Sequence, residues 1–136
     1  MREILFRGKR LGIGEWVEGY FFKAKLYRSD DELSEFITVP HPEVKGLSSD
    51  DFLVDPDTVG QFTGLTDKNG KKIFEGDIVT FKTRTSTFKP LYVRWYAETA
   101  QFLVTTNDCI RSYPMDKSWE YKVIGNIHDN PELLEV

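Results

Sequence analysis

The sequence predicts an all-β protein, and three observations support that fold class. Aromatic residues make up 14% of the 136 residues, and aromatic side chains favour strands. Short β-prone runs alternate with clusters of Gly, Asn, Asp and Pro, which are typical of turns. No segment keeps a 3.6-residue apolar period over three helical turns. Many short strands at this spacing indicate a small barrel or sandwich.

In the first half of the chain, three strands are predicted before the first predicted helical turn. We expect strands at residues 3–7, 15–27 and 36–39, the last stopped by the sequence PHP because proline donates no ladder hydrogen bond. The following SSDDFLVDPDTV is predicted to open with a single helical turn capped by Ser48 or Ser49.

The central stretch TVGQFTGLTDKNGKKIFEGDIV is interpreted as strands separated by turns. Residues 58–63, 73–74 and 78–81 are strand-like, and the residues between them tolerate the backbone conformations of tight turns. Glycine adopts positive φ without a steric penalty, so the chain is expected to reverse at the glycines. The predicted structural turn residues are Gly64, Asn69, Gly70, Gly76 and Asp77.

The last third is predicted to form a hairpin, one further strand and a short helical turn. Residues 91–96 and 102–106 pair about the turn 97–100, and residues 121–127 form the final strand. Pro131 suits the first position of a helical turn, with Asn130 as its cap. The expected core is Phe62, Ile78, Val93, Trp95, Phe102, Val104 and Val123.

Charge and composition indicate the cellular compartment of the protein and argue against some classes of partner. The formal net charge is −4, and the acidic excess lies in residues 1–60, which argues against a protein that coats DNA without sequence preference. Cys109 is the only cysteine, which fits a reducing compartment. Charges interrupt the N-terminal MREILFRGKR, and no apolar run approaches the length of a membrane span. We therefore expect a cytoplasmic protein with no membrane partner.

Three motifs together resemble the YopX-like family of phage and prophage proteins. They are the opening MREILFRGKR with GEWVEGY, the central DPDTVGQFTGLTDKNGKKIFEGDIV, and the closing VIGNIHDNPELL. The resemblance implies an N-terminal β region, residues 1–60, packed on a C-terminal SH3-like small β-barrel, residues 61–136, as two lobes of one domain. It also implies a phage or prophage origin and a bacterial host cell. It implies no activity, cofactor or catalytic residue.

Candidate chemical sites compete with ordinary structural roles. A phosphate loop leads its glycines into a helix, whereas Gly70 is followed by a predicted strand, so we favour a turn. A nucleophilic Cys109 would need a base such as His41 or His128, and the sequence does not bring them together. The acidic residues Asp50, Asp51, Asp55 and Asp57 lack the order of a calcium loop. We therefore predict no catalytic residue, metal or cofactor, and leave enzymatic activity open.

The segment TFKTRTSTFKPLYVRWY, residues 80–96, combines cations with aromatic rings. Single-stranded nucleic acid is commonly bound by cations along a groove and by aromatic faces that stack on bases. Tyr92 and Tyr96 are expected on one strand face with Arg94. The candidate nucleic-acid site is Lys82, Arg84, Lys89, Tyr92, Arg94 and Tyr96. The competing interpretation is a solvated hairpin whose exposed lysines prevent edge pairing.

Two functions follow from these observations. The first is a non-catalytic accessory protein that works as a protein-interaction module, self-associates, and binds an unidentified phage or host protein, because charge complementarity steers association between acidic and basic regions. The alternative is a small β-barrel module that binds single-stranded nucleic acid through the basic and aromatic hairpin.

Overall fold

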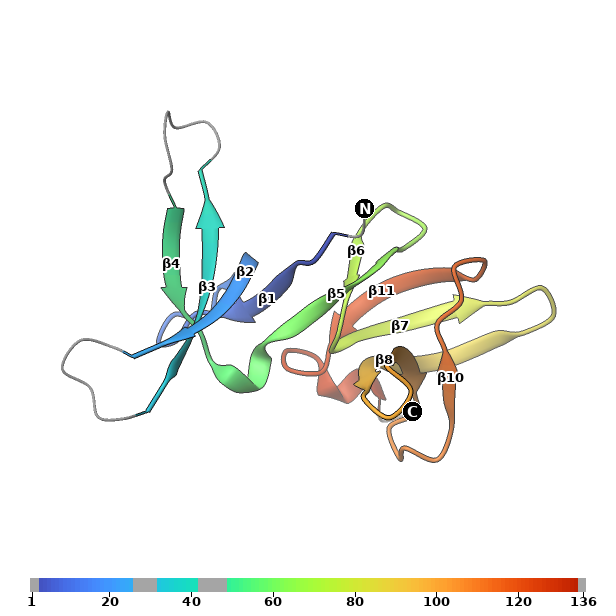
Figure 1. Cartoon of the computed structure of the whole chain (residues 1–136). Coiled ribbons are helices and arrows are strands. Elements are labelled where there is room, and N and C mark those ends of the chain that lie inside the picture. Colours follow the sequence, from blue (N-terminus) through green and yellow to red (C-terminus); the bar gives the residue numbers. More distant parts are fainter. Residues whose placement is uncertain (1–2, 26–31, 42–48, 135–136) are drawn as a thin grey trace. The chain divides into compact units, whose positions relative to one another are not determined.

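The computed structural model describes residues 3–25, 32–41 and 49–134, which divide into two compact units, Met1–Gln61 and Phe62–Val136. Each unit is built from antiparallel strands, and the described residues contain no α-helix (Figure 1). The all-β fold class is confirmed.

The first unit is an antiparallel sheet in which neighbours in sequence pair in order. Its elements are β1 (Phe6–Lys9), β2 (Trp16–Ala24), β3 (Ser34–Pro40), β4 (Ser49–Leu53), the 3₁₀ helix η1 (Pro56–Thr58) and the start of β5 (Gly60–Thr66). β4 pairs with β3, β3 with β2, β2 with β1, and β1 with the first residues of β5. Among the described residues, β4 is therefore an edge strand.

Aromatic and aliphatic side chains hold this sheet together. Ile37 is fully buried, and the rings of Phe22 and Phe36 stack with centroids 5.1 Å apart across β2 and β3. Arg7 is also buried, and its guanidinium lies 4.7 Å from the centroid of the Trp16 ring. The cation and the ring face attract each other, so the strand pair β1–β2 can bury a positive charge.

The second unit contains a five-stranded antiparallel sheet and a short hairpin. The hairpin pairs the end of β5 with β6 (Lys72–Phe74). The sheet has the order β10-β9-β8-β7-β11. Its strands are β7 (Asp77–Lys82), β8 (Thr87–Tyr96), β9 (Gln101–Thr105), β10 (Ser112–Pro114) and β11 (Glu120–Asn126), and the 3₁₀ helix η2 (Pro131–Leu134) follows.

A closed barrel is not found in the described part of this unit. β10 and β11 stand at opposite ends of the strand order and do not pair. The edge of β11 is instead occupied by the β5–β6 turn, where the Lys68 amide donates to the Tyr121 carbonyl over 2.8 Å. The described strands of this unit therefore form an open sheet, and the SH3-like small β-barrel stays a prediction.

The core of the second unit lies on the inner face of this sheet. It comprises Ile73, Val79, Phe81, Leu91, Val93, Val104 and Tyr121. Of the expected core, Phe62, Ile78, Val93 and Val104 are buried, and Phe102 and Val123 pack partly buried against the cluster. Trp95 is 40% exposed, so that prediction is wrong. Its ring meets the edge of Phe102 instead, at 4.9 Å between centroids.

The predicted turns are where the chain differs most from expectation. Gly70 and Gly76 lie in turns with φ of 82° and 92°. Gly64 also has positive φ, 89°, but it lies inside β5, where the register with β6 shifts, and not at a chain reversal. The helical turn expected at Ser49 is wrong as well, because Ser49 begins strand β4; Ser48 lies outside the described residues.

The remaining turn residues are fixed by hydrogen bonds. The amide of Asn69 donates to Asp67 Oδ1 over 2.8 Å, and Gly70 N donates to the Asp67 carbonyl over 3.0 Å. Asp77 is buried and accepts a hydrogen bond from the Phe74 amide over 2.8 Å. The chain after Gly70 enters strand β6, not a helix, so the segment is a β-turn without the helix that a phosphate loop requires.

Candidate functional site

The candidate site is a groove beside the first half of β8. On one side, residues 87–91 of β8 pair with β7, at Leu91↔Val79 and Phe88↔Phe81 among other positions. On the other side, β9 pairs with β8 only from Tyr92 onward. No described strand pairs with residues 87–91 on that side, so this part of β8 is a free sheet edge.

The edge is free because β9 ends in a tight turn. The Arg111 amide donates to Thr106 Oγ1 over 3.1 Å, and the Cys109 amide donates to the Thr106 carbonyl over 2.9 Å. Asp108 completes the turn by accepting from the Thr106 hydroxyl and the Ile110 amide, and these bonds lower the pKa of its carboxyl. The chain then returns as β10 on the far side of β9.

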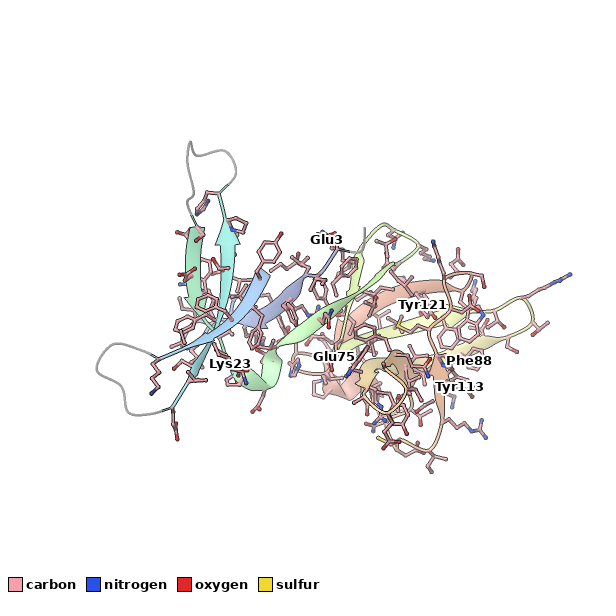
Figure 2. All side chains as sticks on the ribbon, in the orientation of Figure 1. Glu3, Lys23, Glu75, Phe88, Tyr113 and Tyr121 are labelled. Carbon is pink, nitrogen blue, oxygen red and sulfur yellow. The ribbon has the colours of Figure 1, made fainter. Side chains whose placement is uncertain are left out.

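The groove between this turn and β8 has a volume of about 280 Å³. Its lining residues are Thr87, Phe88, Lys89, Pro90, Leu91, Thr106, Arg111 and Tyr113. Phe88 and Tyr113 meet edge to face with centroids 5.4 Å apart, and Figure 2 shows the two labelled side chains close together. The lining holds two cations, Lys89 and Arg111, and no carboxylate.

A stack of aromatic rings supports the groove from the core side. Phe81 stacks on Phe88 at 4.4 Å and on Trp119 at 5.0 Å, so three rings lie nearly parallel. Such contacts add about 0.5–1.5 kcal/mol per pair beyond the area that they bury. Pro90 has no amide hydrogen, which suits an edge position because it removes one donor that would otherwise need a partner. The groove thus has a floor of packed aromatic rings, and the unpaired backbone of β8 lies beside it.

The predicted nucleic-acid residues differ in their surroundings: the first three, Lys82, Arg84 and Lys89, are exposed cations, and the other three, Tyr92, Arg94 and Tyr96, make contacts within the chain. Lys82 and Arg84 are exposed at and beyond the end of β7, and exposed Lys89 lines the groove. Lys82 also lines a second small hollow, of about 60 Å³, whose other cations are Lys68 and Lys122.

The tyrosines of that prediction are engaged within the chain. Tyr92 Oη lies 3.3 Å from Cys109 Sγ, and burial together with this contact raises the pKa of the Tyr92 hydroxyl. Tyr96 donates to the Glu98 carboxylate over 2.6 Å, which raises the pKa of Tyr96. The Arg94 guanidinium lies 5.4 Å from the centroid of the Tyr96 ring. The role of these six residues in binding nucleic acid stays a prediction.

The other chemical candidates are also placed. His41 Nε2 lies 2.7 Å from Asp50 Oδ2, and the His128 amide donates to Asn126 Oδ1 over 3.0 Å. Asp55 accepts the Asp57 amide at the start of η1, an ordinary capping role. The described residues contain no group of three or more His, Cys, Asp or Glu that could hold a metal ion.

Two of the residues that line the groove lie outside the segments that the sequence singles out. Lys89 belongs to the predicted basic segment, but Arg111 and Tyr113 come from a stretch without a clear strand signal. The available signal was the sequence TTNDC at residues 105–109, which is rich in turn residues and ends a strand. None of the described helices is long and apolar enough to cross a membrane.

These observations define an all-β protein of two units, with a free strand edge in the second unit. The chain matches the family model described as "YopX protein" over residues 6–135, and it belongs to that family. A search of curated proteins finds no match.

A solved structure supports the same fold. The crystal structure of protein EF1440 from Enterococcus faecalis is similar to this chain, with 25% sequence identity and a TM-score of 0.52. The match covers 98% of this chain and 99% of that one. The arrangement of strands is thus shared along nearly the whole length of both proteins.

Proposed function

We propose that the protein is a non-catalytic protein-interaction module that self-associates. The observation that carries this proposal is the free edge of β8 at residues 87–91, which lies beside a groove with an aromatic floor and two cations. Apart from Pro90, which has no amide hydrogen to donate, the free edge offers unpaired backbone groups, so an extended segment whose charge complements Lys89 can add to it as a further strand. The aromatic floor adds apolar contact to this backbone pairing.

The wider context of the proposal comes from the family. We propose a phage or prophage accessory protein that works in the cytoplasm of a bacterial host and also meets a phage or host protein. The SH3-like description of the second unit belongs to the same proposal, and its five antiparallel strands support it. The function requires no cofactor.

Sedimentation velocity combined with hydrogen exchange tests the proposal. Over roughly 1 to 100 µM, the range in which a micromolar interaction shows, we expect the sedimentation coefficient to rise with concentration. Amide exchange at residues 87–91 should slow at the higher concentration, whereas exchange in the exposed turn 83–86 should not. A species that stays monomeric throughout would overturn self-association.

Binding of single-stranded nucleic acid is the second candidate. The observation in its favour is the number of cations near the β7–β8 end of the sheet: Lys82 and Lys122 line the small hollow, Lys89 and Arg111 line the groove, and Arg84 is exposed between the two strands. Fluorescence anisotropy with labelled oligo-dT measures it. Removing two phosphate contacts with Lys82→Ala and Arg84→Ala should reduce the slope of log K against log salt by about 1.4. Absence of binding at low salt ends this candidate.

A further inference from the structure

We infer that the occupant of the groove is strand β4 of a second copy of this chain. The inference rests on the proposed function, because it names the partner of the same site. β4 (Ser49–Leu53) is the edge strand of the first unit; its first three residues are exposed, and at its end the Leu53 carbonyl already accepts the Leu11 amide over 3.0 Å. The free edge of β8, residues 87–91, is long enough to pair with the exposed part of β4.

Charge selects this pairing over the alternatives. β4 carries Asp50 and Asp51 on its exposed part, whereas the groove carries Lys89 and Arg111 and no carboxylate. Two β4 edges brought together would place like charges opposite each other, and so would two β8 edges. The pairing of β4 with β8 is the combination of these edges that brings opposite charges together. The same acids that protect β4 from pairing with its own kind thus specify a cationic partner.

The two acids of β4 lie on different faces of a strand pair. Successive side chains of a strand point to opposite faces, so one of Asp50 and Asp51 lies on the face that carries Lys89. In the isolated chain, Asp50 Oδ2 already contacts His41 Nε2 at 2.7 Å, and a carboxylate has further acceptor sites for a second partner. The apolar Phe52 is half-buried in its own sheet, under the guanidinium of Arg10. Backbone pairing and charge, more than apolar side chains, therefore join the two copies.

A charge-swap experiment on the full chain tests this interface. The acidic-strand variant carries Asp50→Lys and Asp51→Lys, and the groove variant carries Lys89→Glu and Arg111→Glu. Each variant alone presents like charges at both edges, so we expect its self-association to weaken by about tenfold or more in sedimentation velocity. An equimolar mixture of the two variants restores opposite charges at every contact, and its association should return toward that of the wild type.

The mixture also controls for folding, because a misfolded variant cannot be rescued by its partner. A matched control is Lys68→Glu with Lys122→Glu, which reverses two cations of the separate small hollow and should leave association unchanged. If the wild type associates and the swap variants associate equally well, this interface is wrong while the proposed function stands. If the wild type is monomeric, both fail. If the groove variant instead loses oligo-dT binding without any effect on association, the cations of the groove serve nucleic acid and the inference is overturned.

Discussion

At the scale of single residues, Asp67 has the clearest structural role. Its carboxylate accepts the amides of Asn69, Lys71 and Val123 over 2.8, 2.9 and 3.1 Å, which ties the β5–β6 turn to β11. Burial tends to raise the pKa of Asp67, but the three amide hydrogen bonds and Lys71 outweigh it, and the pKa lies below its ordinary value. The turn and the edge of the sheet are therefore joined by one ionised side chain.

Asp67→Ala should lower the free energy of unfolding by about 2–3 kcal/mol, because three amides lose their acceptor. A lowered pKa in the folded state means that the contribution is complete above the ordinary aspartate pKa of 3.8 and is lost as the pH falls through the folded value. Urea unfolding at pH 7 and pH 3 measures both effects. Asp116→Ala is the control at an exposed Asx turn. An equal loss in the two variants would contradict the special role of Asp67.

Tyr121 shows the opposite response to pH. Its ring is buried in the core, and burial raises the pKa of its hydroxyl to about 12. The hydroxyl accepts the Asp116 amide over 2.9 Å. Because the folded protein holds the neutral phenol, its stabilising contribution is complete below the ordinary tyrosine pKa of 10.0 and is lost as the pH rises toward 12.

Tyr121→Phe should cost about 1 kcal/mol at pH 7 through the lost hydrogen bond, and should remove the most alkaline step of the tyrosine titration followed by ultraviolet absorbance. Tyr20→Phe, at a residue that is 54% exposed, is the matched control for the loss of one phenol. A titration curve in which Tyr121→Phe leaves the most alkaline step intact would show that the step belongs to another tyrosine.

At the scale of elements, the β2–β3 hairpin depends on a close approach of two backbones. A Cβ added at Gly19 would lie 2.2 Å from the Thr38 carbonyl oxygen, which is fixed in β3. Gly19→Ala should therefore separate the two strands and cost about 3 kcal/mol or more. Gly8→Ala is the milder comparison, since its nearest contact is the Cβ of buried Val54 at 3.2 Å, which requires a shift of only a few tenths of an ångström. Thermal unfolding ranks the two variants, and equal melting temperatures would contradict the argument.

The elements that could be predicted from the sequence are those that depend on residues close together in the chain. The 91–96 and 102–106 hairpin was found because its apolar residues alternate, and the short turn at Pro131 was found because proline suits a helical start. Trp95 was misplaced because alternation gives the face of a strand and not the depth along it: Trp95 lies next to the last residue of β8. Gly64 was misread because a glycine in a strand also permits a register shift.

Edge strands and the candidate site were harder to predict, for a common physical reason. β4 begins Ser-Asp-Asp, a pattern that also caps helices, and an edge strand tolerates it because half of its surface faces water. The groove depends on where β9 ends relative to β8, which is a matter of register between distant residues. Lys89 was therefore identified as a cation, but its position opposite Arg111 and Tyr113 was not.

At the scale of the whole molecule, the uneven distribution of charge is the feature with a functional consequence. The formal net charge of −4 arises from an acidic excess in residues 1–60, while six cations lie at the groove and small hollow of the second unit or on the loop between β7 and β8. These six are Lys68, Lys82, Arg84, Lys89, Arg111 and Lys122. In the proposed interface, copies of the molecule would repel through their net charge and attract through the opposite charges of their β4 and β8 edges.

Salt separates these two contributions. At low salt, exposed charges act over tens of ångströms, and near 1 M salt they act over about 3 Å. If the β4 and β8 edges associate mainly through charge, raising NaCl from about 0.05 to 0.5 M should weaken self-association by roughly tenfold, mostly through slower association. If the aromatic floor of the groove supplied most of the affinity, salt would leave association unchanged or strengthen it, because apolar contact is not screened. Sedimentation velocity is measured across the salt series for the wild type and for the charge-swapped mixture. Association that weakens with salt indicates that charge dominates, and association that salt leaves unchanged or strengthens indicates that the aromatic floor dominates. Both samples carry opposite charges at every contact, so they should respond alike.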